Sequence, residues 1–199
     1  MKPNVIWIFG DQHRAQATGY MGDPNARTPN MDRMAAQGVP FYQAISGCPW
    51  CTPFRGALMT SRYVHRALQQ TPQALDTSLP TVTDAFNDAG YTTAYIGKWH
   101  LTGSNKLIHV PKEHRGRFDI WLGYENNNAQ YDCWIHGHDQ EGRDDTDPLA
   151  EKLEIYETDA LTNRFIDFIK KQKDGDPFFG VLSVQPPHDP YVAPPEYEK

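Results

Sequence analysis

Three short runs rich in β-branched and aromatic residues constrain what this chain can fold into. They span Val5–Phe9, Tyr91–Ile96 and Phe178–Val184. A strand that is apolar at consecutive positions needs cover on both faces, which is the situation of a strand inside a parallel sheet flanked by helices. The runs therefore predict an α/β fold, a three-layer αβα sandwich around a mainly parallel sheet, with these three strands buried on both faces.

Helical periodicity and capping residues occupy much of the chain between these runs. The predicted helices cover residues 29–37, Phe54–Tyr63, Leu79–Ala89 and Leu153–Lys170. Val39–Ile45 is predicted to form a short strand, and the aromatic stretch Arg117–Glu125 is expected to pack over the sheet. This alternation of strand and helix fits the α/β class.

Polar side chains follow each predicted strand directly. Asp11 and Gln12 follow the first run, Lys98 and His100 follow the second, and His188 follows the third. Ligands of open α/β sheets gather at the carboxyl ends of the strands, so these side chains are predicted to share one rim of the sheet. Taken singly, each one is equally compatible with a turn residue or a solvated surface group.

The stretch from Cys51 to Arg55 places a thiol and a guanidinium four residues apart at a predicted helix start. Pro53 suits a first helical turn, and a side chain just before that turn faces the positive end of the helix dipole. That position favours a nucleophile that works as an anion, although an isolated cysteine there is also compatible with a small buried residue. Cys48 and Cys51 form a C-x-x-C pair, the spacing of redox and zinc sites, but no second pair accompanies it.

Composition excludes several classes of protein. With 199 residues, 39% of them hydrophobic, the chain can bury one core, and its net charge of −6 without a basic stripe argues against a nucleic-acid partner. No apolar run approaches the roughly 18 to 20 residues of a membrane span, and three cysteines argue against a disulfide framework. Met1 to Asn4 lead into a strand without a signal-peptide pattern. We expect a cytoplasmic protein as given, or a periplasmic or secreted one if a leader was removed.

Four motifs in this order resemble the type I, formylglycine-dependent sulfatases of the alkaline phosphatase superfamily. They are N-V-x-x-I-x-x-D-Q at residues 4–12, C-x-P-x-R at residues 51–55, G-K-W-H-L at residues 97–101 and P-P-H-x-P-Y at residues 186–191. Phe54 stands where the family usually has serine. The resemblance implies an alkaline phosphatase-like fold in which residues 1–199 form the N-terminal part of the catalytic domain. The family's further metal ligands and a sulfate-binding lysine would then lie beyond residue 199.

The resemblance implies a divalent metal ion held by Asp11, Gln12 and residue 51. Oxygen ligands select a hard cation over zinc, and Ca²⁺ is expected in preference to Mg²⁺. Cys51 itself is expected to be converted to formylglycine by a formylglycine-generating enzyme, and the hydrate of that aldehyde is the family's nucleophile.

The resemblance also implies a role for each remaining site residue in the hydrolysis of a sulfate ester. Arg55 would hold the diol and Lys98 would bridge it to the sulfate. His188 would donate a proton to the departing alcohol, and His100 would take a proton from the second hydroxyl, which expels sulfate and restores the aldehyde.

The substrate is expected to be a sulfated small molecule or saccharide. Lys98 and His188 are predicted to contact it, and a stretch around Asn128 and His136 is predicted to form a pocket wall. The full predicted wall comprises Asn126, Asn127, Asn128, Tyr131, Trp134 and His136. A phosphonate monoester or phosphodiester hydrolase of the same superfamily remains an alternative. A thiol redox module and a non-catalytic binding protein are more remote ones.

Overall fold

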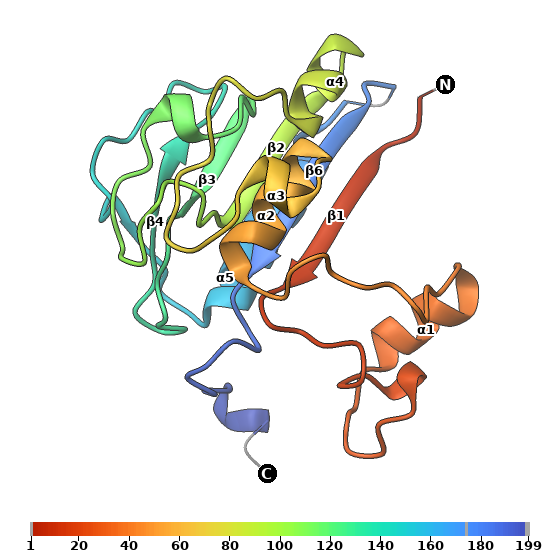
Figure 1. Cartoon of the computed structure of the whole chain (residues 1–199). Helices are drawn as coiled ribbons and strands as arrows, with labels where there is room; N and C mark the ends of the chain where they lie inside the picture. The colour runs from red at the N-terminus through yellow and green to blue at the C-terminus, as the bar shows by residue number, and fades with distance from the viewer. Residues whose placement is uncertain (1, 174, 198–199) are drawn as a thin grey trace.

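The computed structural model describes residues 2–173 and 175–197, and in this part of the chain one six-stranded sheet organises the fold (Figure 1). The strands are β1 (Val5–Gly10), β2 (Thr92–Lys98), β3 (Ile120–Tyr124), β4 (Trp134–His138), β5 (Glu151–Lys152) and β6 (Phe178–Val184). Their order in the sheet is β1-β6-β2-β3-β4-β5. The pairs β1–β6, β6–β2 and β2–β3 are parallel, and β4 and β5 add antiparallel pairs at one side. The predicted α/β class with a mainly parallel sheet is confirmed.

Helices lie on both faces of this sheet (Figure 1). The described helices are α1 (Pro29–Gln37), α2 (Cys51–Thr60), α3 (Val64–Ala67), α4 (Val82–Asp88) and α5 (Glu157–Lys171), with 3₁₀ turns at Gly19–Met21, Lys112–His114 and Pro195–Tyr197. α2, α3 and α4 cover one face, and α5 covers the opposite face, which produces three layers. Among these described helices, none is long and apolar enough to span a membrane.

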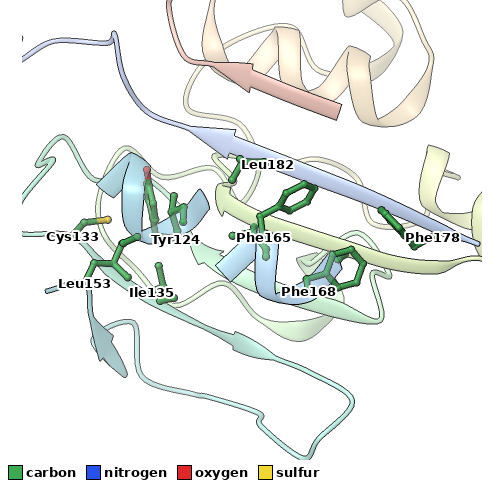
Figure 2. Close-up of a cluster of buried hydrophobic side chains, with 12 residues drawn as sticks. Tyr124, Cys133, Ile135, Leu153, Phe165, Phe168, Phe178 and Leu182 are labelled. Atoms are coloured by element: carbon green, nitrogen blue, oxygen red, sulfur yellow. The ribbon is translucent and has the colours of Figure 1, made fainter. Parts of the chain in front are cut away.

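The hydrophobic core is divided between the two faces of the sheet. On the α5 face, Phe165 and Phe168 pack against Phe178 and Leu182 of β6 (Figure 2). On the other face, large aromatic and aliphatic side chains pack under α2 and α4; they include Met59, Tyr95, Trp99, Phe118, Trp121 and Phe179. Because β2 and β6 carry both sets of side chains, these two strands are buried on both faces, as predicted.

β1 is partly buried on one face and exposed on the other, which corrects the prediction for Val5–Phe9. Trp7 and Phe9 pack against the core under α2, whereas Ile6 and Ile8 are 43% and 63% exposed. β1 occupies the edge of the sheet in the described part of the chain, and no described helix covers its second face. The continuous apolar run predicted the strand correctly, but it does not reveal what lies over each face.

Two other segments differ from the sequence-based prediction. Val39–Ile45 forms no strand: it has no partner strand among the described residues, and its apolar side chains are exposed. The aromatic stretch Arg117–Glu125 does not pack over the sheet but contributes β3 to it, between β2 and β4. Both differences arise because strand formation depends on a pairing partner as well as on β-forming residues.

Helix boundaries shift by a few residues from those predicted. α2 begins at Cys51, three residues before Phe54, so the cysteine lies in the first turn and not before it. α4 begins at Val82, where Thr81 and Asp84 form a capping box. α5 begins at Glu157, because Leu153 still follows the strand β5 and donates its N–H to Cys133 O.

Candidate active site

The carboxylate of Asp11 is the centre of the site. It follows β1 directly, and its backbone N–H donates to Val184 O at 3.0 Å, which joins the carboxyl ends of β1 and β6. Lys98 Nζ lies 2.7 Å from Asp11 Oδ2, and Arg55 Nη2 lies 3.5 Å from the same oxygen. Burial by itself raises the pKa of Asp11, but the adjacent Arg55 and Lys98 charges outweigh it and hold this pKa well below its usual range. Asp11 is therefore an anion at neutral pH.

Arg55 joins α2 to the ends of the central strands. Its Nη1 donates to Lys98 O at 2.6 Å, to Ser183 Oγ at 2.9 Å and to Tyr95 OH at 3.2 Å. The guanidinium also lies 5.4 Å from the centre of the Phe9 ring. A buried arginine with this many acceptors is fixed in position, so it supplies a stationary positive charge beside Asp11.

Cys51 is a protonated thiol in this site. Its Sγ donates to Asp11 Oδ1 at 3.1 Å and Oδ2 at 3.4 Å, although 40 residues separate the two in sequence. Burial, and then the negative charge of Asp11, raise the pKa of Cys51 above its ordinary value. Burial and the adjacent carboxylate therefore favour the protonated thiol over an anionic thiolate at this helix start. Among the described residues Cys48 and Cys51 are both free thiols, so the C-x-x-C pair is not a disulfide.

His100 follows β2 by two residues and has a left-handed backbone with φ of +56°. Its ring is buried, and Nε2 lies 2.9 Å from Asn105 Oδ1. Burial lowers the pKa of His100 to about 4; the positive charges of Lys98 and Arg55 act in the same direction, and the contact with Asn105 opposes them. The imidazole is therefore neutral at pH 7 and can accept a proton.

His188 reaches the site from the loop after β6. Its backbone N–H donates to Gln185 O at 3.0 Å, and its Nδ1 lies 3.4 Å from Asp189 Oδ1. A ring nitrogen of His188, a carboxylate oxygen of Asp11 and Cys51 Sγ all lie within 4.8 Å of one another. The structure thus brings together side chains from residues 11, 51 and 188 that the sequence scatters over almost the whole chain.

Of the other predicted site residues, two are exposed and one is fully buried. Gln12 adjoins Asp11 with φ of +58° and an exposed side chain. Asn128 is exposed, and its Oδ1 accepts a hydrogen bond from Gln185 Nε2 at 3.2 Å. His136 does not line a surface pocket, which corrects that prediction: it is fully buried, and its Nε2 accepts from Val110 N at 2.9 Å.

Two buried carboxylates beside the site were missed from the sequence. Glu125 follows β3 and accepts backbone N–H groups of residues 101, 102 and 104 at 3.2, 2.8 and 3.3 Å, which holds the loop after His100. Glu157 at the start of α5 accepts from Tyr124 OH at 2.7 Å and from Gln185 N at 3.1 Å, which holds the loop before His188. Burial raises the pKa of both carboxyl groups. Glu125 carried a usable signal, a polar residue directly after a strand, whereas Glu157 carried none.

Comparison with known proteins identifies the family. The family model for sulfatases matches residues 3–199. The chain belongs to the sulfatase family. It is 34% identical over 200 residues to the ulvan-active sulfatase of Formosa agariphila, covering 100% of this chain and 38% of that protein. The chain thus spans well under half the length of this relative.

Solved structures share the fold. A crystal structure of the Bacteroides fragilis protein named as the sulfatase yidJ superimposes with a TM-score of 0.86 at 28% identity, over 98% of this chain and 46% of that one. A second structure, a complex with its substrate D-glucosamine-2-N,6-O-disulfate, gives a TM-score of 0.81 at 26% identity, over 98% of this chain and 37% of that one. The alkaline phosphatase-like fold implied by the sequence motifs is confirmed.

Membership of the sulfatase family implies a divalent metal ion and a formylglycine in general terms. The residues present fit part of such a metal site. The anionic Asp11 oxygens face both Cys51 Sγ and a His188 nitrogen, and the amide of Gln12 is adjacent in the chain. Hard divalent cations prefer oxygen ligands, and a thiol is the poor ligand of this set. Replacement of the sulfur by oxygen at residue 51 would improve the fit.

Proposed function

We propose that the intact protein hydrolyses sulfate esters, with residue 51 as the nucleophile position. The observation that carries this proposal is the convergence of Cys51, Asp11 and His188 within 4.8 Å at a rim that also holds Lys98 and Arg55. A sulfate ester is an anion attacked at sulfur, so its hydrolysis needs fixed positive charge and a proton donor for the leaving alcohol. The chain spans 38% of its ulvan-active relative, so the proposal concerns the intact protein.

Conversion of Cys51 to formylglycine is part of the proposal. The unmodified thiol is protonated and bound to Asp11, which makes it a weak nucleophile. A thiol also lacks the second hydroxyl with which an aldehyde hydrate can expel sulfate. We therefore expect a formylglycine-generating enzyme as the partner that activates residue 51.

The proposed proton transfers use two histidines. His188, close to residue 51, donates a proton to the oxygen of the departing alcohol. His100 is neutral and accepts the proton of the second hydroxyl as sulfate leaves. Arg55 holds the hydroxyls of residue 51, and Lys98, which faces Asp11 in this structure, bridges them to the sulfate.

Ca²⁺ is the proposed metal ion, held by Asp11, Gln12 and the oxygen at residue 51. Ca²⁺ accepts both carboxylate and neutral amide oxygens in flexible geometry, whereas Mg²⁺ demands a stricter octahedron. When bound, the cation supplies positive charge to the sulfate oxygens.

A sulfated saccharide is the proposed substrate class. Support comes from the similar structure that was solved with D-glucosamine-2-N,6-O-disulfate as its substrate. The exposed Asn128 remains a proposed contact for such a ligand.

The test uses the intact protein produced with and without a formylglycine-generating enzyme. We expect peptide mass analysis to find the aldehyde at residue 51 only in the first preparation, and release of sulfate from an aryl sulfate and from sulfated glucosamine only there. Cys51→Ala should abolish turnover, and Cys48→Ala is the matched control because it removes the other thiol of the same segment. Turnover of phosphonate esters alone would replace the sulfatase assignment by the phosphonate hydrolase alternative. Activity that persists with a free thiol at residue 51 would contradict the mechanism.

A further inference from the structure

The hydrogen-bond environment of His100 is asymmetric between its two ring nitrogens. Nε2 lies 2.9 Å from Asn105 Oδ1. Nδ1 is buried, and it has no hydrogen-bond partner among the described residues. The two nitrogens are therefore not equivalent in their capacity to bind or release a proton.

The partner at Nε2 determines which nitrogen carries the proton. An amide oxygen can only accept, so a neutral His100 that contacts Asn105 Oδ1 must donate from Nε2–H. Protonation at Nδ1 instead would place two acceptors 2.9 Å apart and leave a buried donor without an acceptor. The lone pair of the neutral ring is then at Nδ1.

Asn105 accepts two further hydrogen bonds, and the loop before it is fixed by Glu125. Its backbone O accepts from Asn126 Nδ2 at 3.1 Å. Thr71 Oγ1 donates to Asn105 Oδ1 at 3.5 Å. Glu125 fixes the preceding loop through the N–H groups of residues 101, 102 and 104. Hydrogen bonds thus fix the segment from residue 101 to 105, and Asn105 in this segment contacts the His100 imidazole.

We propose that Asn105 is a positioning residue that holds His100 as its Nε2–H tautomer, so that Nδ1 is the proton-accepting atom of the site. The tautomer stands on this geometry alone. Its consequence for turnover rests on the proposed function, in which His100 removes a proton from the hydroxyl of residue 51. Asn105 acts through His100 and is not itself in contact with Cys51 or Asp11 in any described interaction.

The charges that act on His100 define how substitutions at residue 105 should change its pKa. Burial is the largest cause of the lowered pKa of His100; the bond to Asn105 raises this pKa, Lys98 and Arg55 lower it further, and Asp11 raises it. Asn105→Leu removes the acceptor and should leave the ring neutral but free to change tautomer. Asn105→Asp keeps an acceptor and adds a negative charge, which favours the imidazolium. Asn105 is exposed, so neither substitution disturbs the core.

The first experiment measures the tautomer directly in the intact protein. The ¹⁵N chemical shifts of the His100 ring distinguish a protonated nitrogen from one with a lone pair, and they require no substrate and no modified residue 51. We expect a proton on Nε2 and a lone pair on Nδ1 in the unsubstituted protein, and a mixture of tautomers in Asn105→Leu. A proton on Nδ1, or one unchanged tautomer in Asn105→Leu, would overturn the proposal whether or not the protein is a sulfatase.

The second experiment follows turnover in the activated enzyme. Asn105→Leu should lower kcat by about tenfold to a hundredfold with KM nearly unchanged, since a misoriented base loses part of its contribution. Asn105→Asp should retain most of kcat and move the acidic limb of the pH profile upward by about one pH unit or more. Ser104→Ala is the matched control, because Ser104 Oγ contacts only Lys106 N among the described interactions. Equal loss in both variants with an unmoved acidic limb would indicate a structural role for Asn105 and refute the proposal.

Discussion

Replacement of Lys98 by methionine removes the closer of the two cations that face Asp11. Lys98 Nζ is 2.7 Å and Arg55 Nη2 is 3.5 Å from Asp11 Oδ2, and the side chains of Lys98, Arg55 and Asp11 are 1%, 3% and 7% exposed. Methionine fills a similar volume without a charge. Arg55 keeps its bonds to Tyr95, Ser183 and the Lys98 backbone, so the guanidinium stays in place and continues to face the carboxylate.

The magnitude follows from the depth of this ion pair. Two unit charges 2.7 Å apart interact by about 6 kcal/mol at an effective dielectric constant near 20, of which desolvation offsets a large part. Removal of one partner of a buried pair costs about 3 to 5 kcal/mol in unfolding free energy. We expect about 3 kcal/mol for Lys98→Met, because Arg55 remains beside Asp11. We expect about 4 to 5 kcal/mol for Asp11→Asn, which leaves two buried cations without their anion. The double variant should cost about 2 to 3 kcal/mol less than the sum of the two.

Urea unfolding of the intact protein with a chelator present measures these free energies without a contribution from bound metal. Arg55→Met should be measured alongside these variants, and it should lower the unfolding free energy by less than Lys98→Met does. The reason is that Lys98 O, which accepts a hydrogen bond from Arg55, also accepts hydrogen bonds from Tyr95 OH and Ser183 Oγ. Lys112→Met is the surface control, since Lys112 pairs with Asp144 while 61% exposed and should change the free energy by less than about 1 kcal/mol. A coupling energy below about 1 kcal/mol between residues 11 and 98 would refute the reasoning, as it would equal that of a surface pair.

Two further predictions concern the buried histidines and a glycine of β2. His100 and His136 have folded-state pKa values of about 4 and about 3, below the ordinary 6.5. The unfolded chain therefore binds more protons, and stability should be complete above about pH 6.5 and fall by a few kcal/mol as the pH drops towards 4; urea midpoints unchanged between pH 7 and 4.5 would contradict this. Gly97→Ala should destabilise the protein by about 3 kcal/mol or prevent folding, because φ is +116° and the added Cβ would lie 1.9 Å from Ser183 O. Thermal unfolding tests it against Gly142→Ala, where φ is +105° with nothing within 4 Å and only backbone strain of about 1 to 2 kcal/mol applies.

The sequence by itself determined the central strands and the residues at their ends. The runs of β-branched and aromatic residues in β2 and β6 identify both segments as strands. Polar residues directly after parallel strands must then meet at one rim, which is why Asp11, Lys98 and His188 could be grouped without coordinates. The four motifs indicated the sulfatase family, because their combined order and spacing are highly specific to it.

The tertiary structure alone decided what each side chain faces. Ile6 and Ile8 are as apolar as their neighbours in β1, yet their exposure depends on the absence of a described helix over that face. His136 had the composition of a pocket residue and is buried instead, because β4 pairs beside β3 within the sheet. The raised pKa of Cys51 comes first from its burial and then from the charge of Asp11, 40 residues away in the chain. The burial and the pKa of a side chain depend on all the residues that lie near it in space. Many of these residues are distant in the chain, so a local sequence pattern does not reveal them.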